Sequence, residues 1–263
     1  MAEEEKAPPP PYTLETAEGL LTRSRGFTGK GKATYKLDEE VIETYEGDFD
    51  DGIRQGKGSY VYKNGDKYIG GFHENLKQGL GRLTYKPPAA EEEAGEEEGE
   101  EAKPKRGGRY YGEYVQGLRE GSGTFHYANG DVYSGDWKEG KKHGWGNYTF
   151  AKDQTKYEGT WANGRFQSGR WIFPTGIFYV GGYRYNKPNG EGVFVFLNGN
   201  QLVGDYTQTL EAVEAEEGKE VKEEPGEGEE GVRAAPVKEP KVLGVQWVSR
   251  EATVVRSARL SAR

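Results

Sequence analysis

The chain has 263 residues, of which 33% are hydrophobic and 13% aromatic, with 41 glycines and a net charge of −8. Aliphatic residues are scarce, so buried apolar surface must come mainly from Tyr, Phe and Trp, and we expect a thin, turn-rich structure. The absence of cysteine excludes disulfides and thiolate metal sites, and it agrees with a reducing compartment.

The N-terminal residues lack the features of a secretory signal. Residues 1–11 are acidic and then proline-rich, without a basic start or an apolar stretch. We expect residues 1–25 to be disordered. No run in the chain approaches the length of about 18 apolar residues that a membrane-spanning helix needs. We therefore expect a protein of the cytoplasm or cytoskeleton.

A repeated unit fills residues 26–207. Each copy has the pattern Tyr-x-Gly-x-aromatic, and a Gly-x-Gly follows eleven residues after the leading Tyr. The paired aromatic residues of the six full copies are Tyr45 and Phe49, Tyr68 and Phe72, Tyr110 and Tyr114, Tyr133 and Trp137, Tyr157 and Trp161, and Tyr179 and Tyr183. Partial copies flank the six, with Gly29, Gly31 and Tyr35 before them and Leu202, Gly204 and Tyr206 after them. Such a periodic unit is typical of a repeat array with atypical ends.

The spacing within each copy predicts a β-hairpin. Residues two apart in a strand share a face, so aromatic residues gather on one face and charged residues on the other. Four Asn-Gly pairs, at Asn64, Asn129, Asn163 and Asn198, predict two-residue turns with positive φ. In the copy at Tyr157 the glycine falls one residue late and the period shrinks to 22, which predicts a local change of twist. The expected fold is all-β, an elongated single-layer meander of stacked antiparallel hairpins with disordered acidic insert and tails.

These residues and their spacing resemble MORN repeats (membrane occupation and recognition nexus) over about 70% of the chain. Within that family, residues 156–161, the irregular copy at Gly169, residues 186–188 and the tail with Trp247 are similar to the radial spoke head subunits of motile cilia. The resemblance implies a structural subunit of the axoneme in a cilium or flagellum. Its implied partners are other radial spoke head subunits in a large hetero-oligomer, and a second MORN-repeat chain is a further candidate partner.

Three appendages interrupt or follow the array. Residues 87–108 form an insert with eight Glu between positions 91 and 101, and we expect it to loop out or to contact a basic partner. Residues 208–241 are predicted to be an acidic disordered linker. Residues 242–263 contain Trp247 and are interpreted as a docking peptide, for a partner or for the array itself, or as a plain tail.

The sequence offers little for catalysis, cofactors or metals. Residues 135–142 nearly fit a phosphate-binding loop, but Lys142 stands where Ser or Thr must bind Mg²⁺. The three histidines, His73, His126 and His143, are unequally spaced and have no cysteine to assist them. The array segments hold 23 Lys and Arg against 19 Asp and Glu, and the remainder holds 13 against 25. A net charge of +4 gives no basic stripe for nucleic acid. We predict no catalytic residues, no cofactor, no metal and no nucleic-acid binding.

The favoured function is a non-catalytic scaffold that binds partner subunits through an aromatic groove. The candidate partner-binding residues are Tyr45, Phe49, Tyr68, Phe72, Tyr110, Tyr114, Tyr133, Trp137, Tyr157, Trp161, Tyr179, Tyr183 and Trp247. The alternative for each ring is that it only holds adjacent hairpins together. The alternative functions are a membrane-surface module that binds phosphoinositides, an adaptor for another cytoskeletal assembly, or an array that regulates an enzyme in trans. The small positive charge of the array makes membrane lipid a weak candidate.

Overall fold

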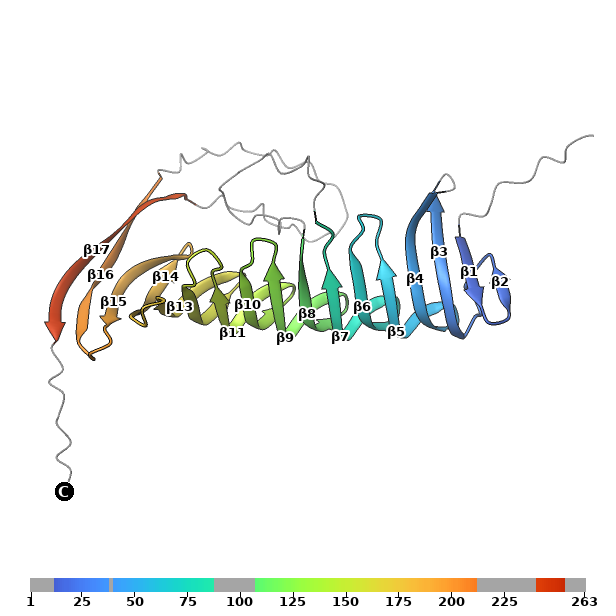
Figure 1. The fold of residues 1–263 in the computed structure, drawn as a ribbon, viewed down its shortest axis with the longest axis horizontal. Coiled ribbons are helices and arrows are strands. Elements are labelled where there is room, and N and C mark those ends of the chain that lie inside the picture. The colour runs from blue at the N-terminus through green and yellow to red at the C-terminus, as the bar shows by residue number, and fades with distance from the viewer. Residues whose placement is uncertain (1–11, 38–39, 88–106, 212–239, 254–263) are drawn as a thin grey trace, which may run out of the picture.

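The computed structural model describes residues 12–37, 40–87, 107–211 and 240–253. Within these ranges the chain forms strands and no helix, and all the strands join one open antiparallel sheet of 17 strands. Figure 1 shows the strands side by side along the long axis of an elongated ribbon. The prediction of an all-β array of stacked hairpins is confirmed.

Strand neighbours follow the chain order except at the first hairpin. The strands are β1 (Tyr12–Thr16), β2 (Gly19–Leu21), β3 (Gly29–Leu37), β4 (Glu40–Asp50), β5 (Ile53–Val61), β6 (Lys67–His73), β7 (Leu76–Thr84), β8 (Gly108–Val115), β9 (Leu118–Tyr127), β10 (Val132–Lys138), β11 (Lys141–Thr149), β12 (Lys156–Ala162), β13 (Arg165–Ile172), β14 (Phe178–Arg184), β15 (Lys187–Val195), β16 (Gln201–Leu210) and β17 (Val242–Thr253). Strand β1 lies between β2 and β3, and from β3 onward each strand pairs with the next one in sequence to β17. The six full copies are the hairpins from β4–β5 to β14–β15.

The turn inside each hairpin has positive φ at both central residues. In the first copy Asp51 has φ 47° and Gly52 has φ 82°, and Asn163 and Gly164 in the fifth copy have 51° and 86°. These angles belong to the two-residue turns whose twist matches that of the flanking strands. The two-residue prediction at Asn163 is therefore confirmed.

The loops between copies differ from the prediction. At Asn64, the Tyr62 N–H donates to the Asp66 carbonyl at 2.9 Å, so three residues rather than two form the loop. Only Gly65 has positive φ, at 82°. The loops at Asn129 and Asn198 have the same bonding pattern. The prediction of two-residue turns is wrong at these three sites. The same Asn-Gly pair also occurs in three-residue loops, in which a type I turn is followed by one left-handed glycine.

A row of glycines crosses the sheet from β3 to β16. Each glycine pairs with the next across adjacent strands, and the members are Gly31, Gly47, Gly58, Gly70, Gly81, Gly112, Gly123, Gly135, Gly146, Gly159, Gly169, Gly181, Gly192 and Gly204. We call this set the glycine row. In the first copy the ring of Tyr45 lies directly over Gly47 and Gly58. A side chain at either position would displace the ring.

The leading tyrosines form the core of a sheet that has only one layer. Tyr45 has 0% exposure, and its hydroxyl donates to the Asp48 carbonyl at 2.8 Å. Its ring packs edge-to-face against Phe49 of its own copy and Phe72 of the next, with centroids 5.0 and 5.1 Å apart. The same contacts with the next copy recur at Tyr68, Tyr110 and Tyr133. Because each ring contacts two copies, stacking of the hairpins and burial of the core are one process.

The copy at Tyr157 keeps the glycine row by changing its register. Gly169 pairs with Gly159, so it takes the place of the second glycine of the repeat pattern. It lies one residue before the position that the second glycine has in the other copies. The hairpin is therefore shorter, and the register shift falls between Thr160 and Trp161. Phe166 is 1% exposed and stacks on Tyr157 at 4.8 Å, 5° from parallel. The other full copies have a register shift with two extra residues on the second strand, whereas this copy has one, and the predicted change of twist stays a prediction.

Both ends of the array are closed by strands outside the repeats. The expectation of disorder over residues 1–25 is wrong for β1 and β2, because β1 pairs with β3 and places Leu14, 0% exposed, beside Gly31. At the other end β17 pairs with β16, and the Trp247 ring lies over Gly204. Residues 242–253 thus dock back onto the array, which was one of the alternatives for this segment. Residues 1–11 and 254–263 lie outside the described residues.

The acidic insert does not interrupt the pairing of the sheet. Strand β7 pairs directly with β8 in the register of the other copies, with Gly81 opposite Gly112. The Tyr85 N–H also donates to the Gly108 carbonyl at 3.0 Å. Residues 88–106 and residues 212–239 of the linker lie outside the described residues, so the expectations for them remain predictions.

The glycine row gives a first prediction. A Cβ at Gly47 would lie 2.6 Å from both the Tyr45 hydroxyl oxygen and the Gly58 Cα, so Gly47→Ala should cost about 1–3 kcal/mol of unfolding free energy. The control is Gly244→Ala, where a Cβ would meet nothing within 4 Å. Urea unfolding followed by circular dichroism compares the two variants. Equal stability of both would contradict the packing role of the row.

Candidate binding face

The candidate rings predicted from the sequence lie mostly inside the protein. We call the side of the sheet that carries the leading tyrosines the aromatic face. Of the thirteen candidates, eleven are at most 7% exposed, and only Tyr157 and Trp247 are partly exposed. The hydroxyls of Tyr68, Tyr110 and Tyr133 donate to main-chain carbonyls within their own hairpins, at 3.0, 3.2 and 2.9 Å. The leading rings therefore build the hairpin stack, as the alternative interpretation held.

Rings on the second strand of each hairpin and in the loops that follow are partly exposed on the aromatic face. These residues are Tyr35, Tyr62, Tyr85, Tyr127, Tyr148, Phe150, Trp171, Phe173 and Phe194. They contact one another along the array, with Tyr127 and Tyr148 centroids 5.6 Å apart and Tyr148 and Phe150 centroids 4.7 Å apart. The sequence contained their signal, since aromatic residues recur two and four residues after the second glycine of most copies.

Four cations lie among these rings, and none of them was predicted from the sequence as a binding residue. Arg54, Lys77, Arg119 and Lys142 each sit opposite the second aromatic residue of their hairpin, on alternate strands from β5 to β11. We call them the cation row. The Arg119 guanidinium lies 4.4 Å from the Trp137 ring centroid, and the Arg54 guanidinium 4.8 Å from that of Tyr60. Such contacts stabilise a cation by about 0.5–2 kcal/mol.

Lys142 has the most aromatic surroundings of the four. Its ammonium nitrogen lies 4.5 Å from the Trp161 ring centroid, 4.8 Å from Tyr148, 5.7 Å from Tyr133 and 6.0 Å from Tyr127. Burial lowers the pKa of Lys142 to about 8, although the nearby charge of Asp131 opposes the change. Burial also lowers the pKa of Lys77. Both ammonium groups are thus poorly solvated.

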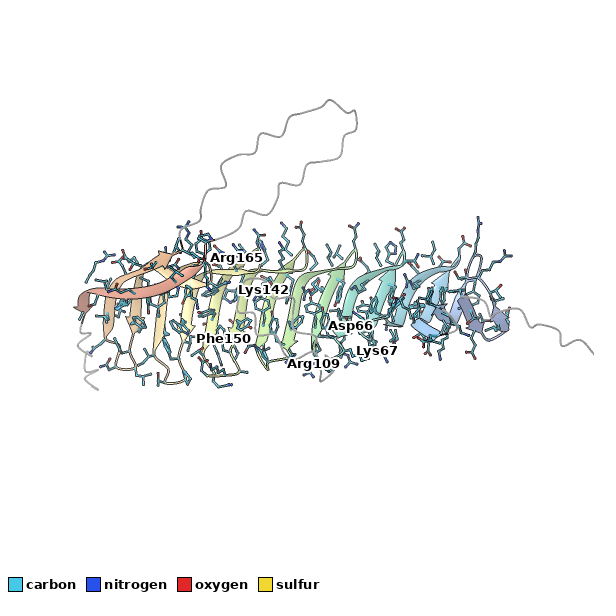
Figure 2. The ribbon with its side chains drawn as sticks, turned by 90° about the horizontal axis from the view of Figure 1, so that it is seen from above. Asp66, Lys67, Arg109, Lys142, Phe150 and Arg165 are labelled. Carbon is cyan, nitrogen blue, oxygen red and sulfur yellow. The ribbon has the colours of Figure 1, made fainter. Side chains whose placement is uncertain are left out.

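Acidic residues on this side of the sheet lie at the edge where the loops join the copies. Asp131 is 7% exposed, accepts from the Tyr148 hydroxyl at 2.6 Å and accepts from the Ala151 N–H at 2.7 Å. Figure 2 shows Asp66 and Phe150 toward this edge and Lys142 toward the opposite one. The carboxylates therefore tie successive loops together and make no ion pair with the cation row.

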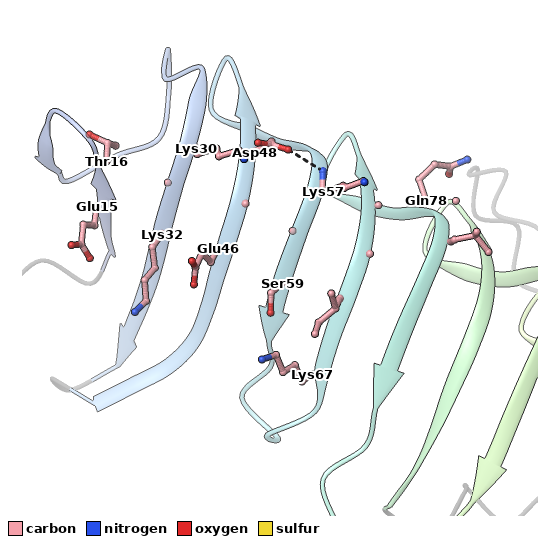
Figure 3. A pocket seen from close by; sticks show the side chains of 18 of the residues that line it. Glu15, Thr16, Lys30, Lys32, Glu46, Asp48, Lys57, Ser59, Lys67 and Gln78 are labelled. Atoms are coloured by element: carbon pink, nitrogen blue, oxygen red, sulfur yellow. Dashed lines mark hydrogen bonds between the residues drawn. The ribbon is translucent and has the colours of Figure 1, made fainter.

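The opposite side of the sheet, the polar face, contains one hollow. It has a volume of about 1200 Å³ and lies over the first hairpins, where Figure 3 shows side chains of both charges. Its charged lining residues are Lys30, Lys32, Lys57, Lys67, Glu15, Glu46 and Asp48. Asp48 accepts from the Lys57 main-chain N–H at 3.2 Å. This hollow therefore lies on the other side of the sheet from the aromatic face, where the partner-binding groove was expected.

The described part of the chain shows no cluster of side chains suited to metal binding. Over residues 12–37, 40–87, 107–211 and 240–253 there is no group of three or more His, Asp or Glu side chains that could hold a metal ion. His73 contacts Gln55 at 3.0 Å, far from the other two histidines in the strand order. The same ranges contain no helix able to cross a membrane.

Comparison with known proteins identifies the repeat. The sequence model of the MORN repeat matches residues 45–67, 68–87, 110–132, 133–155, 157–176 and 179–201, about half of the chain. Among solved structures, the chain is similar to the TCP domain of SAS-4 (dCPAP) in complex with a proline-rich motif of Ana2 (dSTIL) from Drosophila melanogaster. The identity is 12%, the match covers 66% of this chain and 70% of that chain, and the TM-score is 0.25.

The buried tyrosines predict cooperative alkaline unfolding. Burial raises the pKa of Tyr45, Tyr157 and Tyr179 to about 12, against about 10 in an unfolded chain. Their contribution to stability is complete below pH 10 and is lost as pH rises toward 12, by about 1.4 kcal/mol per pH unit for each ring. Tyrosinate absorbance and β-sheet circular dichroism should therefore change together above pH 10. Ionisation of all tyrosines near pH 10 with an intact sheet would disprove this.

Proposed function

Because the chain belongs to the MORN repeat family, whose members are generally non-catalytic repeat scaffolds, we propose that it is a scaffold subunit of the axonemal radial spoke head in motile cilia. The observation that supports a scaffold is the row of partly exposed rings along the aromatic face, to which each of the six copies contributes. A row of this kind offers one long contact surface rather than an enclosed pocket.

The radial spoke assignment rests on the sequence resemblance. Residues 156–161, the irregular copy at Gly169 and residues 186–188 are similar to those of radial spoke head subunits. In the fold, the irregular copy keeps its place in the sheet, and Trp247 packs on Tyr206 with centroids 4.9 Å apart. Trp247 therefore belongs to the array. The residues proposed to contact a partner are now the partly exposed rings of the second strands, in place of the leading rings and Trp247.

The array suits a scaffold because its contacts are repeated and rigid. The Gly140 N–H of one turn donates to the Arg119 carbonyl of the previous copy at 2.9 Å, and equivalent bonds join the other neighbouring turns from the first copy to the fifth. Glu120 also accepts from the Glu139 N–H at 2.9 Å. Side chains on the aromatic face are thus held at fixed intervals, which lowers the ordering cost when a partner binds.

Affinity capture with matched variants tests the proposal. The tagged chain should recover radial spoke head subunits from ciliated cells. The variant Tyr62→Ala/Tyr127→Ala/Phe150→Ala removes three partly exposed rings and should reduce recovery at least about tenfold, the effect of roughly 1.4 kcal/mol.

The control for this experiment lies on the polar face. Tyr111 and Trp145 are both 57% exposed there, so Tyr111→Ala/Trp145→Ala should leave recovery unchanged. Thermal unfolding of each variant checks that the fold is retained. Absence of the tagged chain from isolated axonemes would refute the radial spoke assignment, while equal recovery with both variants would refute the binding face.

A membrane-surface module is the second candidate function, because four lysines line the hollow on the polar face. Glu15, Glu46 and Asp48 share that hollow and offset most of its positive charge. Each basic residue near an anionic membrane contributes only about 1 kcal/mol. Sedimentation with vesicles of neutral lipid, with and without phosphoinositide, separates the two candidates. Salt-sensitive binding to the anionic vesicles alone would favour the membrane role.

A further inference from the structure

Among the residues that the structure describes, the cation row has no carboxylate counter-ion. Within the described ranges no carboxylate lies within 4 Å of Arg54, Lys77, Arg119 or Lys142, since the ion pairs there involve Arg170 and Arg250 instead. The Lys77 and Lys142 ammonium groups also donate no hydrogen bond in this part of the chain, although each could donate three. A partly buried ammonium without a hydrogen-bond acceptor is costly even beside aromatic rings, so an incoming acceptor would be stabilised there.

The two arginines are only partly satisfied within the protein. The Arg119 guanidinium donates to the Gly140 carbonyl at 2.7 Å, and the Arg54 guanidinium donates to the Asn75 side-chain and main-chain oxygens at 3.2 and 3.3 Å. A guanidinium has five N–H donors, so both retain donors that are free to meet a carboxylate. All four cations are partly exposed.

The spacing of the cation row is regular. Its members lie on alternate strands, and strands are about 4.8 Å apart, so neighbouring cations are about 9.6 Å apart along the array. The acidic insert between Lys77 and Arg119 does not change this interval, because β7 and β8 pair directly. The four cations therefore span about 29 Å.

A polyproline II segment has a matching period. It has three residues per turn with a rise of about 3.1 Å, so every third side chain returns to the same side after about 9.3 Å. A β-strand does not match, because residues three apart in a strand point to opposite faces. Ten residues in polyproline II conformation span about 28 Å, close to the length of the row.

We propose that the aromatic face from β5 to β11 binds a partner segment in polyproline II conformation that carries a carboxylate at every third residue, one for each member of the cation row. The partly exposed rings beside the row, including Tyr62 and Tyr127, contact the apolar residues between the carboxylates. The inference rests on the proposed function only in taking the aromatic face as the binding face.

The charges on neighbouring elements fit this arrangement. Glu43, Asp66 and Asp131 lie on the same side of the sheet, but at the loop edge. Glu43 accepts a hydrogen bond from the Tyr60 hydroxyl, and Asp66 and Asp131 accept main-chain hydrogen bonds from the following copy. They leave the line of cations near the opposite edge open to an anion. They also repel an acidic segment placed along the loop edge, which fixes where such a segment can lie.

Two synthetic peptides test the spacing. One repeats Glu-Pro-Pro with four glutamates, and the other has the same composition with its four glutamates contiguous. Fluorescence anisotropy with the full chain should show about tenfold tighter binding of the spaced peptide, and binding should weaken with salt. Both peptides meet the same competition from the Glu-rich segments of the chain. Equal affinities would overturn the proposal.

Two double variants test the residues. Lys77→Gln/Lys142→Gln should reduce the affinity for the spaced peptide about tenfold, whereas Lys77→Arg/Lys142→Arg should retain it. The control Lys32→Gln/Lys67→Gln removes the same charge from exposed positions on the polar face and should change nothing. Circular dichroism and thermal unfolding confirm the fold of each variant. Equal loss in the first variant and the control would show non-specific attraction and overturn the proposal.

The outcome is separable from that of the proposed function. If spoke head subunits are still recovered through Tyr62, Tyr127 and Phe150 while neither peptide binds, the scaffold role stands and this inference fails. If the spaced peptide binds as expected but the chain is absent from axonemes, the binding chemistry stands and the radial spoke assignment fails.

Discussion

The structure depends on one contact, that of a tyrosine ring lying on two glycines of adjacent strands. A single-layer sheet has no second layer to cover its apolar side chains, so it must bury them against its own backbone. At Tyr45 the ring lies on Gly47 and Gly58, and its hydroxyl reaches the Asp48 carbonyl. The glycine provides the space, the hydroxyl fixes the ring, and the ring covers backbone that would otherwise meet water. Because the aromatic residue of the next copy covers the ring in turn, no copy is complete alone.

The same constraint accounts for the two ends of the array. Gly31 and Gly204 are the first and last members of the glycine row, and neither has a leading tyrosine of a full copy over it. Leu14 lies beside Gly31, and Trp247 lies over Gly204. Each comes from a strand outside the repeats, and the guanidinium of Arg250 in β17 pairs with Asp205 and Glu191. These hydrogen bonds lower the pKa of the Asp205 carboxyl. The ends thus substitute other apolar side chains for the tyrosine while keeping the glycine.

Much of the fold could be predicted from the sequence because strand period and glycine position are local properties. Tyr45, Gly47 and Phe49 share a face by strand geometry alone, and this fixed the hairpins and their order. The sequence did not distinguish Tyr45 from Tyr62, since both lie on the aromatic face and only cross-strand packing buries the first and exposes the second. It also gave no signal for β1, whose pairing with β3 is non-local and whose residues lack the repeat pattern. In the sequence, Arg54 and Lys142 cannot be told from ordinary surface charges, because only the folded structure brings aromatic rings around them.

The aromatic face is not uniform along the array, and this bears on how a partner is oriented. In the first four copies the residue opposite the second aromatic side chain is a cation. In the fifth copy it is Phe166, and in the sixth it is Pro188, both buried. The shorter hairpin at Gly169 coincides with this change, because Phe166 stacks on Tyr157 and fills the space that a tyrosine occupies elsewhere. The face therefore divides into a cationic part up to β11 and an apolar part beyond it. A partner that contacts both parts has only one direction in which its charged and apolar residues match, so an array of near-identical copies can still bind with a defined polarity.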